Sequence, residues 1–230
     1  YIEYAQSGRT PSYDDFEPRK RNKRRGQMQV VFVDGYKGIR MNIQDHDTPY
    51  AIYNLKNDPK ERNDLAASGP RFEQLQQEMR DRVLRIRRPN ASAKRPYDKA
   101  PIPAVELNPE TPWSYEFFEG DFSYVPDVEE LKPNRVGTIG TQTPEFGKGA
   151  VRLKGVHRVE LTAAYEVVLT ASKPAYARIH QAELIDADFG FDPDRRYSTI
   201  IRLEKGTHPI CLTVLCDGAA EWKLDFNVIP

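Results

Sequence analysis

Apolar and polar side chains alternate in the first hundred residues in a way that is typical of β-strands. Successive side chains of a strand point to opposite faces, so a period of two predicts one buried face. Residues 27–32 show this period. The side that we expect to be buried consists of Met28, Val30 and Phe32.

A hairpin follows this strand. Asp34-Gly35 supplies the positive φ angles of a tight turn. We expect a return strand over 36–43 and a third strand over 50–55. The apolar side of the return strand consists of Ile39, Met41 and Ile43, opposite Arg40 and Asn42.

One amphipathic helix comes next. Ser68 suits its N-cap, and Pro70 suits its first turn, where a missing N–H costs nothing. Apolar residues at steps of three and four then form one stripe, and Pro89 ends the helix. The stripe consists of Phe72, Leu75, Met79, Val83 and Ile86.

Downstream of residue 113 the chain shows only short alternating strands separated by turn residues. Tyr165, Val167 and Leu169 share one face of such a strand. Many short strands without a helix indicate an antiparallel β-sandwich or jelly roll. The aromatic residues at the start suit a sandwich core or a sugar-stacking platform, and we expect the core. They are Trp113, Tyr115, Phe117 and Phe118.

Six of the 18 prolines lie between residues 89 and 112. Proline removes a backbone donor and fixes φ, so this segment is expected to be a semi-rigid linker or strap. The predicted organisation is an α+β subdomain of three to four strands and one C-terminal helix (1–88), a linker (89–112) and an all-β sandwich (113–230). One helix can cover only one face of a three-stranded sheet. We therefore expect the first unit to be a subdomain of a larger domain.

The net charge of zero conceals two oppositely charged halves. Residues 1–100 carry 21 basic and 14 acidic side chains, whereas residues 101–230 carry 13 basic and 20 acidic ones. This asymmetry suggests two units with different surroundings. No stretch approaches the 18 or so apolar residues of a membrane span. The first residues lack a signal peptide, and we expect the chain to be a segment of a longer one.

The segment after the third strand resembles the C-terminal signature of type I, formylglycine-dependent sulfatases. It reads Tyr53-Asn54-Leu55, then Asp58-Pro59, Glu61 and Asn63-Asp64-Leu65-Ala66, followed by the helix. The preceding hairpin is also similar, so the resemblance covers about residues 1–88. Physically, Asp58-Pro59 makes a turn, Glu61 can accept backbone donors, and Asn63 or Asp64 suits a local cap.

This resemblance implies hydrolysis of sulfate esters, chiefly on sulfated carbohydrates, by a periplasmic or extracellular enzyme. The family's nucleophile lies in Cys/Ser-x-Pro-x-Arg and is converted to formylglycine. Ser68-Gly69-Pro70-Arg71 is the nearest approach, with the arginine one position early. We therefore expect no catalytic residue and no cofactor in this segment, and we expect formylglycine and calcium upstream of it.

Residues 113–230 resemble the jelly-roll domain named for anthrax protective antigen. The resemblance rests on Tyr115-Glu116-Phe117-Phe118-Glu119-Gly120, on Val125-Pro126-Asp127 and on 203–210. The family's Asp-Asp calcium pair is not matched, since Ser172-Lys173-Pro174 stands in its place.

Basic residues 19–25 form the strongest charge run. Such a run is either a solvated loop or a surface that steers an anionic substrate. The candidate substrate-binding residues are Arg24 and Arg25, next to the strand that would flank the cleft. No aromatic residues are interleaved with the run, so we expect no nucleic-acid partner.

Four carboxylates within nine residues could ring a calcium ion or form a solvated acidic loop. They are Asp186, Asp188, Asp192 and Asp194. The stretch lacks the glycine and glutamate of an EF-hand, having Phe191 and Tyr197 there. His180 falls on the face of its strand that we expect to be exposed.

The sequence therefore predicts the C-terminal part of a sulfatase, in which this segment shapes the substrate cleft and carries a β-sandwich. The alternative is a non-catalytic carbohydrate-binding or interaction module with a sulfatase-derived tail. The two differ in whether Cys/Ser-x-Pro-x-Arg precedes this segment in the full reading frame.

Overall fold

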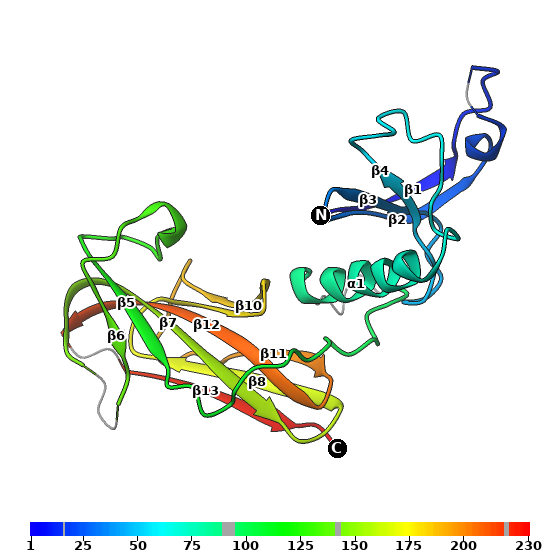
Figure 1. Cartoon of the computed structure of the whole chain (residues 1–230). Helices are drawn as coiled ribbons and strands as arrows, with labels where there is room; N and C mark the ends of the chain where they lie inside the picture. Colours follow the sequence, from blue (N-terminus) through cyan, green and yellow to red (C-terminus); the bar gives the residue numbers. More distant parts are fainter. Residues whose placement is uncertain (16, 89–94, 141–143, 219–220) are drawn as a thin grey trace. The chain divides into compact units, whose positions relative to one another are not determined.

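The chain divides into two compact units. A computed structural model describes residues 1–15, 17–88, 95–140, 144–218 and 221–230. Unit 1 comprises residues 1–84 and 90–100, and unit 2 comprises residues 85–89 and 101–230. Figure 1 labels the elements of both units.

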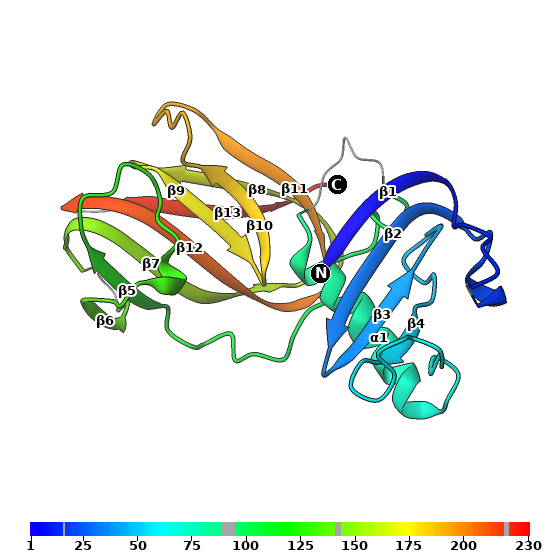
Figure 2. The same cartoon turned by 90° about the horizontal axis from the view of Figure 1, so that it is seen from above.

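Unit 1 contains a four-stranded antiparallel sheet whose strands follow one another in sequence order. Figure 2 shows these strands side by side. They are β1 (Ile2–Arg9), β2 (Arg24–Val33), β3 (Tyr36–Arg40) and β4 (Ala51–Asn54), with the 3-10 helix η1 (Pro18–Lys20) between β1 and β2. The predicted antiparallel subdomain is confirmed.

Helix α1 (Pro70–Ile86) lies along one face of this sheet (Figure 1). It begins at Pro70, as the sequence predicts. Leu75, Met79 and Val83 of the predicted stripe are buried in the core of unit 1. The predicted stop at Pro89 lies outside the described residues.

The predicted buried face of β2 is wrong at Val30 and Phe32, whereas Met28 is buried as expected. Gln29, Val31 and Val33 are buried, whereas Phe32 is 44% exposed. Both faces of this strand carry apolar side chains, so alternation alone does not distinguish them. The helix decides the choice, because Met79 packs on the face to which Val31 belongs.

Within β3 the buried face is also the reverse of the predicted one. Ile43, which lies beyond the end of this strand, is buried as expected. Tyr36, Gly38 and Arg40 are buried, whereas Ile39 is only half-buried. Gly38 explains the inversion, since a Cβ atom at this position would lie 2.5 Å from the Met79 sulfur. The glycine lets the helix approach the sheet closely on that side.

Substitution of Gly38 by alanine is therefore expected to push α1 away from the sheet. The added methyl group would also come within 3.0 Å of the Tyr50 ring. We expect a loss of about 1–3 kcal/mol from overpacking. Amide hydrogen exchange in β3 and α1 measures it. The matched control is Gly140→Ala, where the methyl group would meet no atom within 4 Å, and equal stability of the two variants would contradict the close approach.

Unit 2 is built from two antiparallel sheets, which gives it a β-sandwich character. The larger sheet has the order β10-β9-β12-β7-β5-β6, and the smaller one the order β11-β8-β13. Their bounds are β5 (Ser114–Glu119), β6 (Arg135–Thr138), β7 (Phe146–Val159), β8 (Ala163–Ala171), β9 (Ala175–Ile179), β10 (Ala182–Ala187), β11 (Tyr197–Leu203), β12 (Gly206–Gly218) and β13 (Trp222–Val228).

The core of unit 2 confirms the alternation read from the sequence. Tyr165, Val167 and Leu169 of β8 are all buried in it. Tyr115 and Phe117 belong to the same core, and Trp113 packs against it while partly buried. Phe118 is buried as well, so three of the four aromatic residues are buried as expected.

The described part of the proline-rich segment is a strap. In unit 1, Tyr97 is buried and its ring lies 5.7 Å from the Arg40 guanidinium carbon. In unit 2, Ile102 and Val105 form isolated β-bridges with Leu203 and Thr207. Each part of the strap therefore packs on its own unit.

Candidate functional site

The loop with the Asp-Pro motif is fixed by its own carboxylates. Asp58 accepts hydrogen bonds from the backbone N–H groups of Arg62 at 3.0 Å and Asn63 at 2.7 Å. These bonds hold the pKa of Asp58 below its ordinary value. Asp64 accepts from the N–H groups of Ile52 and Ala66, each at 3.0 Å. The loop is thus rigidly joined to β4.

Glu61 does not have the role that the sequence suggests. We expected it to accept backbone donors, but Asp58 does so instead. Glu61 pairs with the Lys37 ammonium at 2.6 Å and has a φ of 53°. Its backbone oxygen accepts from Lys20 at 2.6 Å. The motif therefore anchors two lysines from distant parts of the chain.

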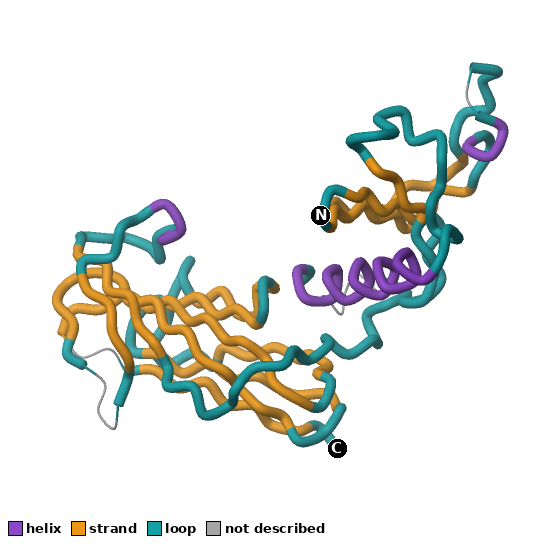
Figure 3. The backbone as a smooth tube through the Cα atoms, in the orientation of Figure 1, coloured by secondary structure: helices purple, strands orange, loops and turns teal. Residues whose placement is uncertain are grey.

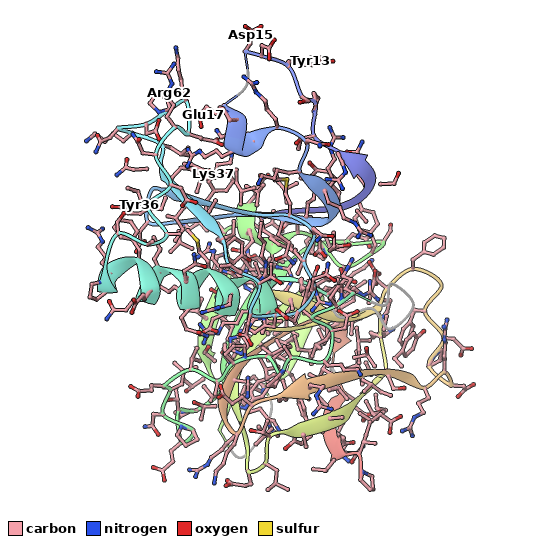
Figure 4. The ribbon with its side chains drawn as sticks, turned by 90° about the vertical axis from the view of Figure 1, so that its right-hand side faces the viewer. Tyr13, Asp15, Glu17, Tyr36, Lys37 and Arg62 are labelled. Atoms are coloured by element: carbon pink, nitrogen blue, oxygen red, sulfur yellow. The ribbon has the colours of Figure 1, made fainter. Side chains whose placement is uncertain are left out.

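A cavity of about 400 Å³ lies between this loop and the segment that joins β1 to β2. Figure 4 shows Asp15, Glu17 and Arg62 at this end of unit 1. The lining carries three cations and two carboxylates. It consists of Thr10, Pro11, Asp15, Glu17, Lys20, Lys60 and Arg62.

Part of the basic run is structural. Arg19 donates to Glu17 at 2.9 Å, and both Arg19 and Lys20 lie over the Tyr53 ring, at 5.9 and 5.4 Å. In the described part of the chain, the side chains of Lys60 and Arg62 have no such partner. These two cations are therefore available to an anion at the cavity.

Arg24 and Arg25 do not line the cavity. They begin β2, where Arg24 is paired in register with Arg9 and is exposed, and Arg25 is half-buried. Their predicted role in substrate binding stays a prediction. Sequence reasoning missed Lys60 and Arg62, although their place directly after Asp58-Pro59 was a signal.

A second cavity, of about 250 Å³, lies on the solvent face of the six-stranded sheet of unit 2. Residues from four strands meet a loop that contains the 3-10 helix η3 (Val128–Glu130). This helix comes between β5 and β6 in the chain and is the purple turn on the left of Figure 3. The strands contribute Arg152, Tyr176, Arg178, Asp186, Cys211 and Thr213, and the loops contribute Val125, Pro126, Asp127, Val128, Glu129 and Asp188.

Two loops of this cavity are joined through Asp188. Its carboxylate accepts a hydrogen bond from the Val125 N–H at 2.9 Å, and its own N–H donates to Asp186 at 3.1 Å. Burial, and to a smaller extent the charge of Asp186, raises the pKa of Asp188 although the Val125 hydrogen bond opposes the shift. Burial therefore disfavours the ionised form of the Asp188 carboxylate, and a cation bound beside it would stabilise that form.

The structure brings together only two of the four candidate calcium ligands. Asp186 and Asp188 line the cavity, whereas Asp192 and Asp194 do not. Within the described ranges, no three His, Cys, Asp or Glu side chains form a group that could hold a metal ion. The arrangement thus supplies two carboxylates where a calcium site needs six to eight oxygen ligands.

A histidine pair in unit 2 was missed by sequence reasoning. His180 Nε2 lies 2.9 Å from His208 Nδ1, and His208 Nε2 lies 2.8 Å from the Glu204 carbonyl oxygen. We expected His180 to be exposed, but it is half-buried in this contact. No sequence signal joins these residues, because β9 and β12 pair only in the folded sheet.

Comparisons with known proteins leave the family open. No family model and no curated protein matches the chain. A β-glucosidase from Kluyveromyces marxianus in complex with glucose has a TM-score of 0.40 and 12% identity, over 51% of this chain and 16% of that one. An anti-sigma factor domain-containing protein has a TM-score of 0.37 and 18% identity, over 57% of this chain and 49% of that one. The chain thus spans less than a fifth of the β-glucosidase, and likenesses this low assign no function.

The described helices include none that is long and apolar enough to cross a membrane.

Proposed function

We propose that this chain is the C-terminal part of a sulfatase that acts on sulfated carbohydrates. The proposal rests on the sequence resemblance, and one structural observation supports it. Strand β4 runs into the carboxylate-fixed loop 54–66 and then into α1, in the order that the sulfatase signature implies. The loop presents Lys60 and Arg62 at a cavity whose charge suits a sulfate group.

In this proposal unit 1 forms one wall of the substrate cleft. Formylglycine and calcium belong to a catalytic domain that precedes residue 1, and the protein works in the periplasm or outside the cell. Unit 2 is an accessory jelly roll that sets the access of substrate. Sulfated glycans are the partners, and nucleic acid is not.

The decisive test is the reading frame upstream. A type I sulfatase needs about 400 residues before this segment, on domain-size grounds. We expect Cys/Ser-x-Pro-x-Arg among them and hydrolysis of an aryl sulfate by the full-length protein. Absence of the motif, or no hydrolysis by a protein that carries formylglycine, would overturn the proposal.

Replacement of both Lys60 and Arg62 by alanine in the full-length protein is expected to raise the KM for a sulfated oligosaccharide by about tenfold or more, since two charge-assisted contacts are lost. The kcat for a small aryl sulfate should stay unchanged because the chemistry lies elsewhere. The comparison pair is Arg24→Ala with Arg25→Ala, the candidates from the sequence. An unchanged KM in the first pair would remove the cavity of unit 1 from the substrate path.

The rival function is a non-catalytic carbohydrate-binding or interaction module. The cavity of unit 2 favours it, because that cavity combines uncompensated carboxylates with an arginine and a tyrosine. A full-length protein without sulfatase activity that binds on a glycan array would establish this rival.

A further inference from the structure

The floor of the cavity in unit 2 carries a hydroxyl group that has no hydrogen-bond partner in the described part of the chain. Thr213 is only 7% exposed and lines the cavity. Among the described residues, no group makes a hydrogen bond with its hydroxyl. A threonine hydroxyl that lines a cavity can accept a hydrogen bond from a donor of a ligand. The hydroxyl is therefore available to a polar ligand group in the cavity.

Two carboxylates beside this hydroxyl lack a counter-ion. Neither Asp186 nor Asp188 has a salt-bridge partner within the described part of the chain. Each accepts one backbone hydrogen bond, from Asp188 and Val125 respectively. A carboxylate has capacity for further donors after one such bond. Together with Thr213, these two carboxylates offer three acceptor groups to a ligand.

Neither arginine of the cavity forms an ion pair with Asp186 or Asp188 in the described part of the chain. Arg152 is held by Glu116 at 2.5 Å and Glu129 at 2.7 Å. The Arg178 guanidinium stacks on the Tyr176 ring, with its carbon 5.1 Å from the ring centroid. Four carboxylates and two arginines line the cavity, so an anion would meet net repulsion and a cation net attraction.

The number of acceptors fits an ammonium group. A primary ammonium has three N–H donors, and Asp186, Asp188 and Thr213 provide one acceptor group for each. A calcium ion would need six to eight oxygen ligands around it, and within the described ranges no three His, Cys, Asp or Glu side chains are grouped to hold a metal ion. A neutral polyol would satisfy the hydroxyl but would leave both carboxylates without a counter-charge.

The size and the rim of the cavity define the rest of the ligand. A volume of about 250 Å³ suits the end of a chain better than a large rigid molecule. Tyr124 is 68% exposed and Phe189 is fully exposed. They directly neighbour Val125 and Asp188, which join the two loops. Exposed aromatic rings that are next in sequence to cavity-lining residues can contact an aliphatic stem and its cation.

We propose that this cavity binds a primary ammonium group at the end of an aliphatic chain. The ammonium donates to Asp186, Asp188 and Thr213, and the aliphatic stem leaves past Tyr124 and Phe189. Two sources share this chemistry: a free polyamine and a lysine side chain of a polypeptide. The proposal does not rest on sulfatase activity, which belongs to a different domain.

Calorimetric titration of the 230-residue chain with 1,5-diaminopentane and with Nα-acetyl-lysine N-methylamide tests it. We expect at least one of the two to bind, and 1,5-pentanediol, the neutral analogue, to bind about tenfold more weakly or not at all. Binding of the diamine alone identifies a polyamine as the ligand. Binding of the lysine derivative identifies a polypeptide side chain.

Variants locate the site. Asp188→Asn keeps the Val125 hydrogen bond but removes the charge, and we expect it to weaken binding about tenfold or more. Thr213→Val keeps the side-chain shape and should weaken binding about fivefold. Asp192→Asn, on the same loop but outside the cavity, is the matched control and should change affinity less than about twofold. Near-ultraviolet circular dichroism checks that each variant is folded.

Three results would overturn the proposal. The first is that neither ammonium probe binds. The second is that 1,5-pentanediol or a methyl glycoside binds as tightly as the diamine, because charge then has no part in recognition. The third is that Asp192→Asn weakens binding as much as Asp188→Asn, because the acidic surface then acts without a defined site. If Asp188→Asn is unfolded, Asp186→Asn replaces it in the same comparison.

Discussion

Replacing Arg40 by methionine is expected to cost unit 1 about 3 kcal/mol, because a buried group that holds several acceptors is lost. Arg40 is 2% exposed, although it is a charged residue. Its Nε donates to Gln29 Oε1 at 2.7 Å, and its Nη1 donates to the carbonyl oxygens of His46 and Thr48 at 2.8 and 2.9 Å. Methionine would fill the space but leave both carbonyl oxygens without this donor.

The Arg40 guanidinium is in contact with two aromatic rings and forms no ion pair with a carboxylate in the described part of the chain. Its guanidinium carbon lies 4.5 Å from the centroid of the Tyr50 ring and 5.7 Å from that of the Tyr97 ring. Burial is the main cause that lowers the pKa of Arg40 from its ordinary value. The cation is therefore stabilised by rings and carbonyl oxygens, and a desolvated cation–π contact contributes about 2 kcal/mol. The Met variant loses this contribution too.

Amide hydrogen exchange in β2 and β3 measures the loss. The two tryptophans, Trp113 and Trp222, both lie in unit 2, so their emission follows unit 2 separately. The control is Arg24→Met, because Arg24 is an exposed arginine at the start of β2. We expect this variant to lose less than about 0.5 kcal/mol of stability. Unchanged protection of β2 in Arg40→Met would show that the buried arginine contributes nothing net.

Arg40 also shows where sequence reasoning failed in unit 1. Charged residues are almost never fully buried, so the pattern was read with Arg40 on the exposed side and Ile39 on the buried side. That choice gave the wrong buried face for β3. The buried face of β3 is determined by Gly38. Because this residue has no side chain, Met79 of a helix more than thirty residues away can pack against the strand there. A local pattern contains no such contact.

Where local periodicity and long-range packing agree, the sequence predicted the elements well. The stripe of Leu75, Met79 and Val83 and the alternation of Tyr165, Val167 and Leu169 are both buried as expected. The cavity of unit 2 was not predictable, since its residues come from segments that only the sheet order brings together. Asp186 and Asp188 were found as an acidic pair, but Arg152 and Thr213 carried no signal.

Acidification is expected to destabilise unit 2 through its histidine pair. The Nε2–H of His208 donates to the Glu204 carbonyl oxygen, so His208 Nδ1 must accept a hydrogen bond from His180. Both rings are neutral in this arrangement, and protonation of His208 Nδ1 would place two donors face to face. His157 lies opposite His208 in the register of β7 and β12, and Arg85 adds a further positive charge near the pair.

The sign of the effect follows from the pKa values. Burial is the main cause that lowers the pKa of His180 to about 3, with smaller contributions from His208 and Arg85. Burial also lowers the pKa of His208 and of His157 from 6.5. Below pH 6.5 these histidines therefore bind more protons in the unfolded chain than in the folded chain. The free energy of unfolding consequently falls as the pH falls from 6.5 toward the pKa values of the folded state. Above that range these groups give no pH dependence.

For His180 alone we expect a loss of about 1–2 kcal/mol at about pH 5, after allowance for its partial exposure. Urea unfolding followed by tryptophan emission at about pH 7.5 and about pH 5 measures it in unit 2. In His180→Gln the amide N–H can still donate to His208 but no longer titrates, so the difference between the two pH values should shrink. His46→Gln in unit 1 is the control and should leave this difference unchanged. If His180→Gln retained the full difference, the pH dependence would belong to other groups of the sandwich, because the hydrogen bond to His208 would be present in both proteins.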